Sequence, residues 1–112
     1  MVLITGPLYS GKRDFARKLL PPGADFEKLV CPDAQDLARG CQDLPGLAQR
    51  LAGQFQVVLF TETGGGVVPM DAAQRQEREA AGRLGCLLAE RADTVVRVFC
   101  GLPLVLKGEL PS

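Results

Sequence analysis

The stretch that decides the fold is Met1–Ala16, MVLITGPLYSGKRDFA. Val2–Thr5 is a short apolar run that predicts a strand, and Asp14–Leu20 has a helical pattern. Between them lies Gly6–Lys12, with glycine, four residues, glycine and lysine in the order G-x-x-x-x-G-K. Backbone N–H groups in such a loop form an anion nest, the helix N-terminus adds its dipole, and the lysine reaches the β- and γ-phosphates of a nucleotide. The stretch therefore predicts a P-loop.

The candidate nucleotide-binding residues of this loop are Gly6, Ser10, Gly11, Lys12 and Arg13. Lys12, as the phosphate clamp, is also a catalytic candidate. Arg13 stands where a P-loop usually has Ser or Thr to hold Mg²⁺, so magnesium chemistry is in question and no metal ligand is predicted. Arg13 could bring a guanidinium to the phosphates in place of the metal, could block the metal, or could point into water. The other interpretation of the whole loop is a Gly/Pro turn with Lys12 and Arg13 in solvent.

The totals exclude several classes of function. A chain of 112 residues predicts one domain over residues 1–112, and its 13 basic and 13 acidic side chains cancel. No long run of one charge indicates a nucleic-acid or membrane surface, and no apolar run is long enough to span a membrane. Without a signal-peptide pattern, we expect a cytoplasmic protein. The chain has no histidine and its four cysteines form no C-x-x-C pair, which argues against Ser–His or Cys–His catalysis and against zinc.

The rest of the chain alternates predicted strands and helices. A helix is expected from Pro32, with Asp33 as its N-cap. Pro45 either breaks this pattern or begins a second helix that ends at Gly53, and the longest helix is expected from Asp71 to about Arg91. Further strands are expected at Phe26–Cys31, Gln56–Thr61, Thr94–Cys100 and, as a short edge strand, Leu104–Leu106. This order predicts an α/β fold of three layers with a mostly parallel sheet and a short C-terminal edge strand.

A second loop, Glu62–Gly66, follows the predicted strand Gln56–Thr61 directly. Ligands of parallel sheets gather at the carboxyl ends of the strands, so this loop and Gly6–Lys12 are expected at one edge and in one site. Glu62 is the second catalytic candidate: it could hold a metal-bound water or act as a base near the γ-phosphate. The other interpretation is a carboxylate in solvent.

With these residues in hand, the chain resembles the bifunctional adenosylcobinamide kinase / adenosylcobinamide-phosphate guanylyltransferases of cobalamin biosynthesis. Ile4–Lys12 is similar to the family's I-T-G-x-x-x-S-G-K. Val57–Lys107 holds VVLFTETGGGVVP, then Arg75, Arg78 and Arg83 in a pattern like R-x-x-R-x-x-x-G-R, and ends on ADTVVRVFCGLPLVLK. The resemblance implies a RecA-like fold, ATP or GTP at the P-loop, a corrinoid substrate whose hydroxyl is phosphorylated, and a homo-oligomer, often a trimer.

The departures from the family are Arg13, a shortened central segment over Ala24–Gln56, and the missing histidine that the family guanylylates. They argue against guanylyl transfer and leave three classes of function: a kinase-like enzyme, a nucleotide-binding accessory subunit without turnover, and an assembly subunit without a nucleotide. Arg75, Arg78 and Arg83 could reach phosphates from a neighbouring subunit or form a solvated helix surface. The sequence does not choose between ATP and GTP.

Overall fold

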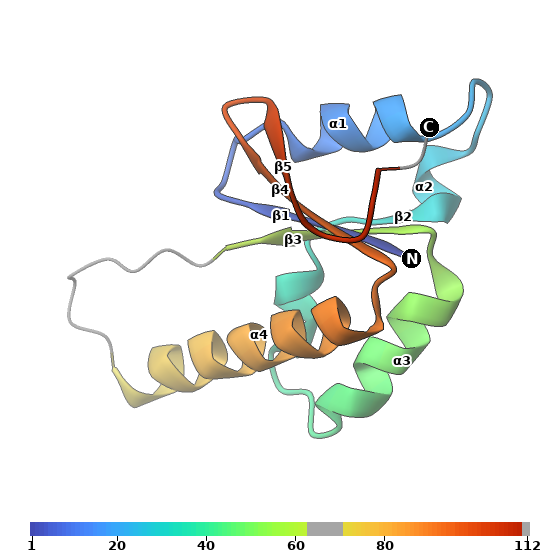
Figure 1. The fold of residues 1–112 in the computed structure, drawn as a ribbon. Helices are drawn as coiled ribbons and strands as arrows, with labels where there is room; N and C mark the ends of the chain where they lie inside the picture. The colour runs from blue at the N-terminus through green and yellow to red at the C-terminus, as the bar shows by residue number, and fades with distance from the viewer. Residues whose placement is uncertain (63–70, 111–112) are drawn as a thin grey trace.

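A five-stranded sheet forms the centre of the protein, in the order β2-β3-β1-β4-β5. The computed structural model describes residues 1–62 and 71–110 (Figure 1). β1 lies in the middle and pairs in parallel with β3 and β4, β2 pairs in parallel with β3, and β5 runs antiparallel to β4 at the edge. The strands are β1 (Val2–Gly6), β2 (Val30–Cys31), β3 (Val57–Thr61), β4 (Thr94–Phe99) and β5 (Leu102–Lys107). The predicted α/β fold with a mostly parallel sheet and an antiparallel C-terminal edge strand is confirmed.

Helices cover both faces of the sheet. In Figure 1, α1 and α2 lie on one side of the sheet, and α3, α4 and the 3₁₀ helix η1 lie on the other. Alternate strand residues fill two apolar clusters, so that Ile4 packs on the α1 side and its neighbour Leu3 on the α4 side. The helical segments are α1 (Lys12–Leu19), α2 (Phe26–Leu29), η1 (Ala34–Ala38), α3 (Leu44–Gln54) and α4 (Ala72–Arg91).

The segment after α1 differs from the sequence prediction. Instead of one strand over Phe26–Cys31, the chain forms the single turn of α2 and then β2, whose residues Val30 and Cys31 pair with β3. Phe26 and Leu29, three residues apart, pack against the cluster on the α1 side, and this helical spacing accounts for the turn.

Asp33 is also placed differently. Its backbone has a φ of 50°, in the left-handed region, and its side chain makes no capping hydrogen bond to η1. The helix predicted from Pro32 is therefore a short 3₁₀ turn, and the Asp33 carboxylate is available for a contact elsewhere. Aspartate enters the left-handed region more easily than most residues, which explains why the prediction of an N-cap was wrong here.

The longest helix begins and ends as predicted. Asp71 accepts a hydrogen bond from the backbone N–H of Gln74 at 2.8 Å, and the Gln74 side chain accepts one from the Asp71 N–H at 3.3 Å. This capping box starts α4, which ends at Arg91. The glycines of the second predicted loop, Gly64–Gly66, lie outside the described residues.

Candidate phosphate-binding site

The loop Gly6–Lys12 joins the end of β1 to the first turn of α1, and both of its motif glycines are required by close packing. A Cβ on Gly6 would collide with the backbone oxygen of Val98. Gly11 has a φ of 94°, and a Cβ there would lie 3.3 Å from the Cα of Gly101. The Gly101 N–H donates a 2.8 Å hydrogen bond to the Ser10 carbonyl. The turn between β4 and β5 thus packs against the loop and fixes its shape.

Lys12 lies beneath this loop and is held by neutral groups. Its Nζ donates to the carbonyl oxygens of Pro7 at 2.7 Å and Gly6 at 3.3 Å, and is 3.5 Å from the Ser10 hydroxyl. The residue is only 8% exposed. Burial lowers the pKa of its ammonium, while the charges of Asp33 and Glu62 oppose that shift. No carboxylate in the described part of the chain forms an ion pair with Lys12.

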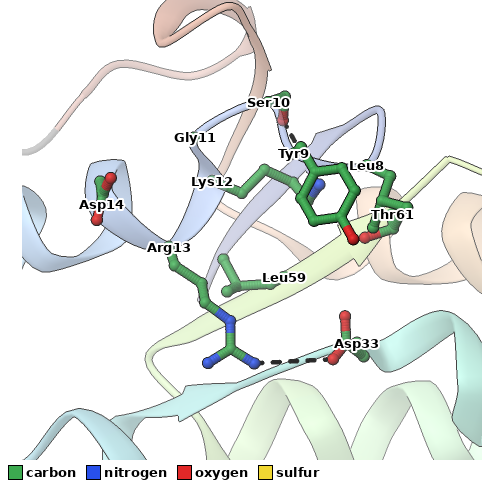
Figure 2. Close-up of a pocket in the computed structure, with 10 residues that line it drawn as sticks. All are labelled: Leu8, Tyr9, Ser10, Gly11, Lys12, Arg13, Asp14, Asp33, Leu59 and Thr61. Atoms are coloured by element: carbon green, nitrogen blue, oxygen red, sulfur yellow. Dashed lines mark hydrogen bonds and ion pairs between the residues drawn. The ribbon is translucent and has the colours of Figure 1, made fainter.

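A cleft of about 540 Å³ opens beside the loop, a volume within the range of small-ligand sites (Figure 2). Arg13 reaches across it toward Asp33, with its guanidinium nitrogen 3.8 Å from a carboxylate oxygen. Both side chains are more than half exposed, at 57% and 53%, so this ion pair is weak. The lining residues are Leu8, Tyr9, Ser10, Gly11, Lys12, Arg13, Asp14, Asp33, Leu59 and Thr61.

Glu62 lies at the same edge of the sheet but not among the residues that line the cleft. Its carboxylate is bound in a bidentate ion pair by Arg97 of β4, with Nε–Oε1 at 2.7 Å and NH2–Oε2 at 3.0 Å. The hydrogen bond from Arg97 is the main reason that the pKa of Glu62 lies below its ordinary value of 4.5, and the charge of Lys12 contributes. Because an ionised carboxylate with a lowered pKa is a weak proton acceptor, this geometry gives no support to a general base at Glu62.

Strand register explains why two residues 35 positions apart meet. Arg97 pairs with Thr5 of β1, while Thr61 pairs with Gly6, so Glu62 comes directly after the last paired residue of β3. β3 and β4 flank β1, and the ion pair therefore bridges β1 at the point where the P-loop begins. Arg97 was not among the residues predicted from sequence. The signal that could have found it was a lone charge in the apolar strand TVVRVF, because such a residue needs a partner.

The described residues do not fit a magnesium site of the usual P-loop kind. Arg13 occupies the position of the hydroxyl ligand, and the carboxylates of Asp33 and Glu62 are each paired with an arginine. Within residues 1–62 and 71–110, no group of three or more acidic, cysteine or histidine residues is placed to hold a metal ion.

The structure brings together five of the sequence-predicted site residues in the loop and cleft: Gly6, Ser10, Gly11, Lys12 and Arg13. The arginines of α4 lie elsewhere. None of the three predicted arginines lines this cleft, and Arg83 lines a separate cavity of about 630 Å³ beside Pro45 of α3. The roles of Glu62 and of Arg75, Arg78 and Arg83 stay predictions.

The fold and the loop define a P-loop α/β protein. Residues 26–106 match the family model of cobinamide kinase / cobinamide phosphate guanyltransferase, and the chain belongs to this family. It is 37% identical over 81 residues to the bifunctional adenosylcobalamin biosynthesis protein CobP of Pseudomonas aeruginosa. That alignment covers 72% of this chain and 46% of the relative, so the chain spans about half the length of the curated relative.

The family match begins at Phe26, after the P-loop. The identity of Gly6–Lys12 as a phosphate site therefore rests on its own sequence and geometry. The loop and the family match are two independent observations that point to the same class of protein.

Proposed function

We propose that this chain is a nucleotide-binding domain related to cobinamide kinase, which binds ATP or GTP through the phosphates at Gly6–Lys12. The observation that carries the proposal is the buried Lys12 ammonium, which in the described part of the chain hydrogen-bonds to neutral groups. A buried cation without a counter-charge favours an incoming anion, because a charge-assisted contact with phosphate is stronger than a contact with a carbonyl. The cleft beside the loop has room for the ligand.

Of the two reactions named for the bifunctional family, we expect the kinase reaction and not guanylyl transfer. A kinase-type transfer to the hydroxyl of a corrinoid is the reaction that fits a phosphate clamp at Lys12. Guanylyl transfer through a histidine is not assigned, because none of the 112 residues is a histidine. Arg13 adds a second positive charge at the cleft and takes part in phosphate binding in place of a metal ligand.

The second candidate function is an accessory or assembly subunit without turnover. It is favoured by the pairing of Glu62 with Arg97, which leaves the carboxylate occupied. Assembly with other copies, as the family resemblance implies, is supported by the exposed leucines of β5, Leu102, Leu104 and Leu106, which are 57–72% exposed. In the part of the chain that the structure describes, no helix has the length and hydropathy to cross a membrane.

The test of nucleotide binding is calorimetric titration of the chain with GTP and with ATP, each with and without Mg²⁺. We expect micromolar binding that does not require the metal. Lys12→Ala is expected to weaken it by about a hundredfold, since a hydrogen bond to a charged group contributes roughly 1.5–3 kcal/mol. Lys18→Ala is the matched control, because Lys18 is an exposed lysine in the last turn of the same helix.

Absence of binding of either nucleotide to the wild-type chain would contradict the proposal. An equal loss in both lysine variants would also contradict it, because the effect would then follow net charge rather than the loop. Turnover with a cobinamide acceptor separates the kinase from the accessory subunit.

A further inference from the structure

At the carboxyl edge of the sheet, the two carboxylates have ion-pair partners among the described residues, whereas Lys12 does not. Lys12 lies close enough to Asp33 and Glu62 for both carboxylates to affect its pKa, yet neither forms an ion pair with it among the described residues. Each carboxylate instead has its own arginine: Arg13 for Asp33 and Arg97 for Glu62. The Arg97 pair is the stronger, with two short hydrogen bonds against a single contact of 3.8 Å.

The Arg97 side chain contacts both the Glu62 carboxylate and the ring of Phe99. It lies over the ring of Phe99 with 5.7 Å between the guanidinium carbon and the ring centroid, and its strand partner on β5 is Leu104. Its Nε and one terminal nitrogen face Glu62, in the bidentate geometry that guanidinium and carboxylate favour. The bidentate ion pair holds the Glu62 carboxylate against Arg97, across the end of β1.

We propose that Arg97 is a positioning residue for anion binding: by holding and neutralising Glu62, it leaves the ammonium of Lys12 free to meet a phosphate. The proposal rests on the proposed function and deepens it, since it assigns a role at the P-loop to a residue that does not line the cleft. Without Arg97, the Glu62 carboxylate would repel the incoming phosphates and would compete for Lys12. Both effects weaken binding, and neither requires a direct contact between Arg97 and the ligand.

The test compares three variants by titration with ATP, and with inorganic pyrophosphate as a base-free probe, at low and high salt. Arg97→Leu is chosen because leucine suits the apolar neighbours Phe99 and Leu104. We expect it to weaken binding by about tenfold at low salt, the order of effect expected from one unpaired carboxylate charge, that of Glu62, near the phosphates. High salt should reduce the defect, because salt screens a repulsion through solvent. Arg50→Leu, at an exposed arginine of α3, controls for the change in net charge and should leave affinity unaltered.

The decisive arm is the double variant Arg97→Leu/Glu62→Gln, which removes both charges. We expect it to recover affinity to within about threefold of the wild type, whereas a purely structural role of Arg97 predicts no recovery. Glu62→Gln alone is expected to bind more tightly, because a negative charge near Lys12 is removed; this arm keeps the test informative if Arg97→Leu fails to fold.

Wild-type affinity in Arg97→Leu, a double variant as weak as Arg97→Leu, or weaker binding in Glu62→Gln would each overturn the inference. Failure of the wild-type chain to bind either probe is a different result, which counts against the proposed function itself.

Discussion

Lys12 and Glu62 carry opposite charges at one edge of the sheet, and they differ in burial and in ion pairing. Lys12 is buried under a loop, and its hydrogen-bond partners among the described residues are neutral. The Glu62 side chain keeps 35% of its surface in water and is neutralised by a bidentate arginine. Within residues 1–62 and 71–110, the Lys12 ammonium has no ion-pair partner, whereas the Glu62 carboxylate is paired with Arg97. This difference is the basis of the proposal that the site binds an anion from outside the chain.

The largest effect is expected from Gly6→Ala, which disturbs the loop that holds Lys12. The new Cβ would collide with the Val98 carbonyl, so the loop must shift and the carbonyls that hold Lys12 must move with it. We expect a loss of roughly 2–4 kcal/mol in the free energy of unfolding, with weakened nucleotide binding. Urea denaturation measures the loss.

Gly53→Ala is the matched control for Gly6→Ala. Gly53 lies within α3, and a Cβ added there would meet no neighbouring group within 4 Å, so alanine should stabilise the protein by about 0.5–1 kcal/mol. Equal stability of Gly6→Ala and the wild type would show that the loop is not fixed by its contact with β4.

A smaller effect, about tenfold in affinity, is expected from Arg13→Ser, which restores a hydroxyl at the position of the usual metal ligand. Wild-type binding should change little on addition of Mg²⁺, because Arg13 supplies positive charge at the cleft. The Arg13→Ser variant should bind more weakly without Mg²⁺ and recover when Mg²⁺ is added. Calorimetry with and without the metal checks this, and Arg50→Ser, at an exposed arginine of α3, is the control. A wild-type chain that binds only with Mg²⁺ would refute the role given to Arg13.

The smallest effect is expected from Glu62→Gln, which removes the ion pair with Arg97 and its pH-dependent contribution to the free energy of unfolding. The pKa of Glu62 is lowered in the folded chain, so its ion pair stabilises the protein above the ordinary value of 4.5, and this contribution is lost as pH falls through the folded pKa. Glu62→Gln should cost about 0.5 kcal/mol at neutral pH, a small value because both partners are more than a third exposed.

Urea denaturation of the wild type and of Glu62→Gln at pH 7 and at about pH 3 measures this difference. The two proteins should approach equal stability at the lower pH. Glu90→Gln, at an exposed glutamate of α4, is the control. A gap between wild type and Glu62→Gln that widens on acidification would show that the ion pair is not what stabilises this edge.

Much of this arrangement could be predicted from sequence because its signals are local. The spacing of Gly6, Gly11 and Lys12 fixes a loop between a strand and a helix, and the Asp71–Gln74 capping box fixes the start of α4. The fold class followed from the alternation of strands and helices.

The missed features depend on contacts between distant segments. The turn of α2 forms because Phe26 and Leu29 pack on the core, which overrides the β-like sequence of Phe26–Cys31. Arg97 becomes the partner of Glu62 only because β1 lies between their strands, and strand order was not determined by the sequence. Glu62 was expected in the site with Lys12; it follows β3 at the same edge of the sheet, where Thr61 lines the cleft, and its role stays a prediction.

The most direct test of the difference between Lys12 and Glu62 is a crystal structure of the chain with a non-hydrolysable ATP or GTP analogue. We expect Lys12 Nζ to leave the Pro7 carbonyl and contact a phosphate oxygen, while the Glu62–Arg97 ion pair stays intact. A nucleotide bound away from Gly6–Lys12, or one that displaces Glu62 from Arg97 while Lys12 keeps its carbonyl contacts, would contradict this account of the site.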